Sequence, residues 1–234
     1  MKILGIDTAS GCLSAALVED GRLTCLTARD DGLKHSVNLM PMLVSALESH
    51  DLRPGDIDLF AVTNGPGSFT GLRIGVAAVK GMAFAADKPC AGVSTLEALA
   101  QALGRVCGLV FPVMDARRDQ VYNAVFDPCG TRLRPDRAIS LDALYEDMLT
   151  LAIDGIDVYL VGDGAGMCYD FLAAKELPLA LYVVPPNIRM SAAYGAAVAG
   201  QKKLTRGEAV SASELTINYL RLPQAERERQ GINN

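Results

Sequence analysis

The same order of predicted elements occurs twice along the chain, and this repeat constrains the fold more than any single motif. In the first half, the apolar spacing predicts three short strands, a helix, a strand and a second helix, at residues 3–7, 12–19, 22–27, 37–47, 56–64 and 70–86. In the second half, the spacing predicts three strands, a helix and a strand, at residues 109–115, 120–127, 132–139, 141–151 and 158–162. A repeat of this length implies two similar α/β lobes that face each other across a cleft.

A shift of the sequence by 108 residues superimposes the two halves. Asp7 then falls on Asp115, and Ala16 falls on Ala124. The alternative is a chance alignment of two ordinary β-hairpins, but a repeated βββαβα order suits the actin-like (ASKHA) architecture. We therefore predict a lobe at residues 1–106, a similar lobe at 107–222 and a charged, flexible tail at 223–234.

Composition narrows the possible functions and the compartment. The formal net charge of −5 and the pI near 5.1 argue against unaided binding to a phosphate backbone, which depends on clustered Lys and Arg. The six cysteines form no CxxC pair, which favours reduced thiols over a disulfide framework or a zinc cluster. No secretory signal is evident, and Lys80 interrupts the longest apolar run. We expect a cytoplasmic protein with no membrane segment.

A glycine-rich turn, Thr63 to Gly75, joins a predicted strand to the helix at 70–86. Such a turn is a generic anion cradle, but this one lacks the lysine of a P-loop. The helix itself carries Gly71, Gly75 and Gly81, and each costs about 1 kcal/mol relative to alanine. Close approach of another backbone would compensate for this loss. The helix is also apolar nearly all round, so it is either a core helix covered by its own chain or one that meets another subunit.

Five short motifs, in order along nearly the whole chain, resemble the TsaB (YeaZ) family. They are Asp7-Thr8-Ala9-Ser10, His35-Ser36 with Leu39 and Pro41, the run from Gly65 to Arg73, Asp115-Ala116-Arg117-Arg118, and Asn218-Tyr219-Leu220-Arg221. The resemblance implies an actin-like fold and a place in the bacterial complex with TsaD and TsaE. That complex makes N6-threonylcarbamoyladenosine at position 37 of ANN-decoding tRNAs, and this chain would meet tRNA only through the complex.

The resemblance also implies a partner surface on two helices, used for a homodimer when the chain is alone and for a heterodimer with TsaD. The interface residues it implies are His35, Leu39, Met42, Leu43, Gly71, Leu72, Gly75, Val76, Val79 and Met82. A scaffold or dimerisation subunit is the resulting functional hypothesis.

No catalytic residue and no metal ligand are expected. The catalytic paralogue carries an HxxxH metal motif, and Thr95 and Leu99 stand where its two histidines would be. The alternatives are a small-molecule kinase or ATPase of the actin-like fold and a glycoprotease-like metallopeptidase. The turn Asp115 to Arg118 has no glycine, which argues against phosphate chemistry.

Weak ATP or ADP binding without turnover stays open, and no cofactor is otherwise expected. A nucleotide or anion site would draw on Asp7, Thr8, Ser10, Gly65, Gly67, Arg117, Gly162 and Gly164.

Overall fold

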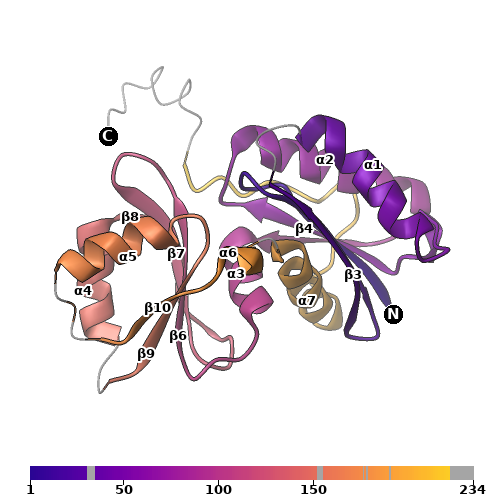
Figure 1. The fold of residues 1–234 in the computed structure, drawn as a ribbon. Helices are drawn as coiled ribbons and strands as arrows, with labels where there is room; N and C mark the ends of the chain where they lie inside the picture. Colours follow the sequence, from indigo (N-terminus) through magenta and orange to yellow (C-terminus); the bar gives the residue numbers. More distant parts are fainter. Residues whose placement is uncertain (31–34, 152–154, 176, 178, 190, 222–234) are drawn as a thin grey trace.

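The computed structural model describes residues 1–30, 35–151, 155–175, 177, 179–189 and 191–221, and it shows two lobes (Figure 1). The first lobe contains β1 (Lys2–Asp7), β2 (Leu13–Glu19), β3 (Arg22–Arg29), α1 (His35–Glu48), β4 (Leu59–Gly65), α2 (Phe69–Ala86), β5 (Cys90–Ser94) and α3 (Thr95–Leu103). A short 3-10 turn at Pro54–Asp56 precedes β4, so the predicted strand at 56–64 begins three residues late. The predicted tail at 223–234 lies outside the described residues.

The second lobe, which α7 (Ala192–Thr205) follows in the chain, contains β6 (Gly108–Asp115), β7 (Gln120–Phe126), β8 (Arg132–Ser140), α4 (Leu141–Leu151), β9 (Asp157–Val161), α5 (Ala165–Ala174), β10 (Leu181–Val183) and α6 (Pro186–Arg189). Its sheet has the order β8-β7-β6-β9-β10, and the first sheet has the order β3-β2-β1-β4-β5. In each sheet the first strand pairs antiparallel with the second and parallel with the fourth. Asp7 and Asp115 both end the first strand of their sheet, which confirms the predicted repeat.

Alternating side chains of β1 face two different helical layers. Leu4 and Ile6 pack into a cluster with residues of α1 and α2, whereas Ile3 packs with Ala197 of α7. A side chain's direction in a strand has a period of two, so one apolar strand serves both layers. The first sheet is therefore covered on both faces, by α1 and α2 on one and by α3 and α7 on the other (Figure 1).

The chain returns to the first lobe after the second sheet is complete. Helix α7 packs on β1, β2, β4 and α3, and Val210 then pairs with Cys90 of β5. The approach is close: a Cβ at Gly195 would lie 1.8 Å from the carbonyl oxygen of Ala98, and one at Gly5 would lie 2.0 Å from that of Ala193. The predicted division at residue 107 separates the two sheets, but it wrongly assigns residues 192–221 to the second lobe.

Helix α1 is apolar on two faces rather than one. The apolar spacing of the sequence predicts one stripe that joins Leu43 and Leu47 to Val37, Met40 and Val44. In the structure, Leu43 and Leu47 are buried, but the other three are exposed and form a second stripe at helical spacing. This second apolar face of α1 is not covered by any described part of the chain.

Candidate functional site

The loop after β1 is held by a set of buried hydrogen bonds. Asp7 is 1 % exposed, and its Oδ1 accepts hydrogen bonds from Thr63 Oγ1 at 2.6 Å and from the backbone N–H of Ala9 at 3.0 Å. His35 Nε2, at the start of α1, lies 2.8 Å from the carbonyl oxygen of Ser10. These bonds fix the loop between β4 and α1, so the predicted site residues Asp7 and Ser10 have structural partners.

Burial raises the pKa of the Asp7 carboxyl above its ordinary value of 3.8, and the nearby Asp163 acts in the same direction. The hydrogen bonds from Thr63 and Ala9, and the charge of His35, oppose this shift in pKa without cancelling it. The folded state therefore holds a proton on Asp7 at pH values where the unfolded chain has released it.

The variant Asp7→Asn should separate this effect from the other carboxyl groups. The asparagine keeps an oxygen acceptor and mimics the protonated acid, so the variant's free energy of unfolding should exceed that of the wild type at pH 8. The difference should shrink as the pH falls towards 4, because wild-type Asp7 then gains its proton. Urea denaturation at several pH values measures this difference, and a difference that does not vary with pH would contradict the assignment.

The glycine-rich turn is covered by the chain's own backbone. A Cβ at Gly67 would lie 2.4 Å from the carbonyl oxygen of Ala9, and one at Gly65 would lie 2.0 Å from that of Asn218. Both glycines also have positive φ angles, of 155° and 134°. The N–H of Asn218 donates to the carbonyl oxygen of Asn64 at 2.7 Å. The glycines of this turn are thus accounted for by close approach of two segments of the same chain.

The glycines of α2 have two different environments. A Cβ at Gly71 would lie 2.0 Å from the carbonyl oxygen of Thr8, and one at Gly75 would lie 2.3 Å from Thr8 Oγ1. The Thr8 hydroxyl donates to the carbonyl oxygen of Gly71 at 2.8 Å. A Cβ at Gly81, in contrast, would meet nothing within 4 Å. The close approach expected from these glycines is made by the chain's own Thr8 at two positions, and Gly81 alone faces open space.

The second-lobe residues of the predicted nucleotide or anion site do come together. The N–H of Arg117 donates to Asp115 Oδ1 at 2.6 Å, and the N–H of Asp115 donates to Asp163 Oδ1 at 3.2 Å. A Cβ at Gly164 would lie 3.1 Å from the nitrogen of Asp115. Gly162 has a φ of 123° and lies against the carbonyl oxygen of Val113. The turn after β6 and the turn before α5 are therefore neighbours, and binding of a nucleotide there stays a prediction.

The positions where the paralogue's metal ligands would stand lie in the core. Thr95 and Leu99, both in α3, are 1 % and 4 % exposed. Among the residues that the structure describes, no group of three or more His, Cys, Asp or Glu side chains gathers to hold a metal ion.

Most of the residues implied for the partner interface are packed inside the first lobe. Those that are buried are His35, Leu39, Met42, Leu43, Gly71, Leu72, Gly75, Val76 and Val79, and Met82 is half-buried. The exposed apolar residues of the two helices are other ones: Val37, Met40, Val44, Ala77, Gly81, Phe84 and Ala85. We call these seven residues, with the groove that Met82 and Pro54 help to line, the α1–α2 face.

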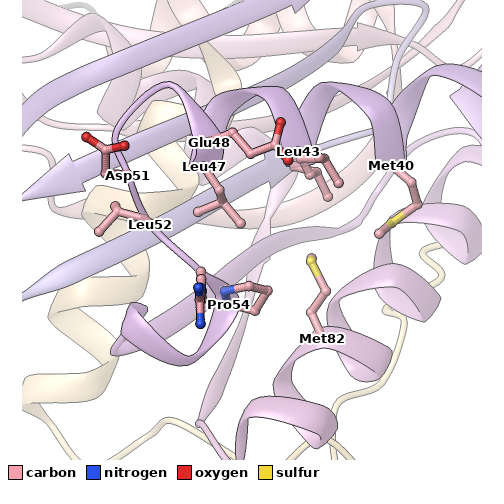
Figure 2. A pocket seen from close by; sticks show the side chains of 10 residues that line it. Met40, Leu43, Leu47, Glu48, Asp51, Leu52, Pro54 and Met82 are labelled. Atoms are coloured by element: carbon pink, nitrogen blue, oxygen red, sulfur yellow. The ribbon is translucent and has the colours of Figure 1, made fainter.

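A groove runs along the α1–α2 face. It consists of two adjoining hollows of about 450 and 530 Å³, and Met40, Pro54 and Met82 line both of them. Figure 2 shows Met40 and Leu43 of α1 on one side of the groove and Met82 of α2 on the other. Charged side chains, Glu48, Asp51 and Arg53, line only one of the two hollows.

The polar residues of α2 are engaged by the chain's own C-terminal part. Lys80 Nζ donates to the carbonyl oxygens of Ser213 at 3.2 Å and Leu215 at 2.9 Å, and Arg73 Nε donates to Tyr219 Oη at 3.1 Å. By length and composition, α2 is the single helix in the described ranges that could cross a membrane, but such a core helix of a folded lobe passes the same test. Its two basic residues point to the C-terminal part and leave the α1–α2 face uncharged along α2.

The architecture places the chain among the two-lobed proteins of the actin-like fold. The activator of 2-hydroxyisocaproyl-CoA dehydratase from Clostridium difficile, solved with bound ADPNP, has a TM-score of 0.54 at 13 % identity and covers 89 % of this chain and 97 % of its own. The ROK hexokinase from Thermus thermophilus has a TM-score of 0.54 at 14 % identity and covers 87 % of this chain and 100 % of its own. These likenesses establish the fold alone.

Closer similarities identify the family. The model of the family TsaD, tRNA N6-adenosine threonylcarbamoyltransferase, matches residues 31–226. YeaZ from Pseudomonas aeruginosa has a TM-score of 0.73 at 26 % identity and covers 94 % of this chain and 99 % of its own. The tRNA threonylcarbamoyladenosine biosynthesis protein TsaB from Bacillus subtilis is 40 % identical over 126 residues, which is 54 % of this chain and 55 % of its own. The chain belongs to the TsaB (YeaZ) family and spans about half the length of the curated relatives it matches.

Proposed function

We propose that this protein is a non-catalytic subunit in the synthesis of N6-threonylcarbamoyladenosine on tRNA in the cytoplasm. It binds a catalytic TsaD-type paralogue through the α1–α2 face, and a TsaE-type ATPase and tRNA join through the resulting complex. The observation that carries this proposal is the uncovered α1–α2 face, on a chain whose relatives are named for threonylcarbamoyladenosine biosynthesis.

Burial of the exposed apolar side chains of this face in a complex would lower the free energy of association. Phe84 is 82 % exposed, and burial of one such side chain contributes about 1.5–3 kcal/mol. Aromatic side chains at the centre of an interface, next to a groove, typically supply much of the binding free energy. Gly81 leaves an open spot on α2 where the backbone of a partner helix can approach.

A paralogue is the occupant that fits this face best. The family model that matches residues 31–226 describes the threonylcarbamoyltransferase, so a TsaD-type protein has a related two-lobed fold with equivalent helices. Two such helix pairs would pack helix against groove in a near-symmetric arrangement, with the same kind of surface on both sides. The same surface would also form a homodimer when the chain is alone. The net charge of −5 also favours a route to tRNA through a partner.

Light scattering after size exclusion tests the proposal directly. The chain alone is expected to form a homodimer, and an equimolar mixture with the TsaD-type protein of the same organism is expected to form a one-to-one complex at the expense of that homodimer. The mixture with TsaE, ATP, tRNA and threonylcarbamoyl-adenylate should modify tRNA, and omission of this chain should reduce the yield. If no complex with the TsaD-type protein formed at protein concentrations of tens of micromolar, the proposal would be overturned.

A further inference from the structure

We propose that residues Asn218–Arg221 form a strap that fixes the two lobes against each other after the end of β6, in addition to the buried cluster through which α3 packs on the second sheet. This inference goes beyond the proposed function and does not depend on it. The strap begins on the first lobe, where the backbone N–H of Asn218 donates to Asn64. Upstream, Lys80 fixes the carbonyl oxygens of Ser213 and Leu215, so the strap leaves the first lobe from an anchored position.

The middle of the strap is bound to the first turns of α2. The ring of Tyr219 stacks on that of Phe69, with centroids 4.9 Å apart and an angle of 27° between the planes. Its hydroxyl accepts a hydrogen bond from Arg73 Nε at 3.1 Å. A stacked aromatic pair contributes beyond the area that it buries, and here a hydrogen bond also fixes the orientation of the Tyr219 ring.

The end of the strap is bound to the second lobe. Arg221 Nη1 donates to the carbonyl oxygen of Ala116 at 2.9 Å, in the turn between β6 and β7. The same guanidinium lies over the ring of Tyr122 of β7, with its Cζ 5.6 Å from the centroid. Two residues of one short segment, Tyr219 and Arg221, therefore bind opposite lobes. Figure 1 shows this yellow segment leaving the first lobe towards the gap between the two lobes.

The strap lies at the far end of β6 from the first connection between the lobes. That connection, residues 104–107, enters β6 at Gly108, whereas the strap holds Ala116, directly after the last residue of β6. At about 3.3 Å per residue, the two points are separated by roughly 25 Å along the strand. The second connection between the lobes, after β10, leaves the second sheet towards this same end, where the N–H of Val184 donates to the carbonyl oxygen of Leu160 at 2.9 Å, and the strap adds a non-covalent contact there.

Little space remains under the strap. The cavity between the turn at Pro66–Gly67, Phe69, Leu72 and the strap has a volume of about 10 Å³. That is room for one water molecule at most. A ligand of any larger size therefore needs the strap to leave before it can enter at this point.

Hydrogen exchange and small-angle scattering on the full chain test the strap. We expect Arg221→Ala and, separately, Tyr219→Ala to raise the radius of gyration and to speed amide exchange in residues 116–120 and 66–72. The exchange should be faster by about tenfold for Arg221→Ala, the change expected for loss of one charge-assisted hydrogen bond. The control is Arg206→Ala, the same change at an exposed arginine at the end of α7, which should alter neither measurement.

The variant Tyr219→Phe tests the two contacts of this ring separately. It keeps the stacking on Phe69 and removes the hydrogen bond from Arg73, so it should speed amide exchange less than Tyr219→Ala does. Faster exchange confined to the turn at 116–120, with no change in the radius of gyration, would overturn the strap in favour of a purely local contact. Unchanged exchange in both Arg221→Ala and Tyr219→Ala would overturn it altogether.

Discussion

Replacement of Gly75 by leucine is expected to destabilise the first lobe rather than to release a monomer as stable as the wild type. A Cβ at this position would lie 2.3 Å from Thr8 Oγ1, and the rest of the leucine has no space between α2 and the loop after β1. The same replacement also disturbs the hydrogen bond from Thr8 to Gly71. Overpacking of a core costs about 1–3 kcal/mol and sometimes more, which is a large share of a domain's total stability of roughly 5–15 kcal/mol. Urea denaturation followed by circular dichroism measures the loss.

The matched control for this variant is Gly81→Ala on the same helix. Nothing lies within 4 Å of a Cβ at Gly81, and the residue is exposed, so the alanine should raise the free energy of unfolding by about 0.5–1 kcal/mol. A lower free energy of unfolding for Gly75→Leu and a higher one for Gly81→Ala would distinguish the effect of internal packing from that of helix propensity. A Gly75→Leu protein as stable as the wild type, with only its association lost, would show that Gly75 faces a partner instead.

A single aspartate in the α1–α2 face should strongly weaken association while the fold persists. Val44 is 46 % exposed and lies beside the groove, so Val44→Asp costs the isolated chain little. In a complex, the carboxylate would be buried among apolar side chains without a partner, and affinity should fall about a hundredfold, or roughly 2.7 kcal/mol. Titration calorimetry with the TsaD-type protein measures the affinity, and light scattering measures the homodimer.

The second lobe offers a control of the same residue type and similar exposure. Val183 of β10 is 41 % exposed, and Val183→Asp should leave both the homodimer and the complex unchanged. If Val44→Asp bound as tightly as the wild type, or if Val183→Asp weakened binding equally, the α1–α2 face would not be the interface.

The sequence predicts four strands of each sheet because strands of a repeated unit keep their apolar alternation, but it misses the edge strands β5 and β10. Asp7 and Asp115, aligned by a shift of 108 residues, end equivalent strands. The destination of α7 could not be predicted in the same way. Its buried positions are mainly alanine and glycine, which suit close packing on almost any helix or sheet, so the pattern does not specify which lobe it covers.

The helices that carry the α1–α2 face were predicted from the sequence, but the side chains on their exposed surface were not. Leu39 and Met40 of α1 are both apolar, but Leu39 is buried and Met40 is exposed. Periodicity alone does not specify which of two apolar faces of a helix meets the core. Gly71 and Gly75 indicated a close backbone contact, but the contact is with Thr8, far away in the sequence. The role of Tyr219 and Arg221 was missed because it depends on Phe69 and Ala116, which are brought near only by the complete fold.

The return of α7 to the first sheet has a consequence for the order in which the protein is made. One face of the sheet begun by Lys2–Asp7 has only α3 on it until Ala192–Thr205 has been synthesised, after all strands of the second sheet. As the chain emerges from a ribosome, the core of the second sheet can therefore be completed first. During that time one apolar face of the first sheet stays incompletely covered. The first lobe is synthesised first, but its packing is completed last.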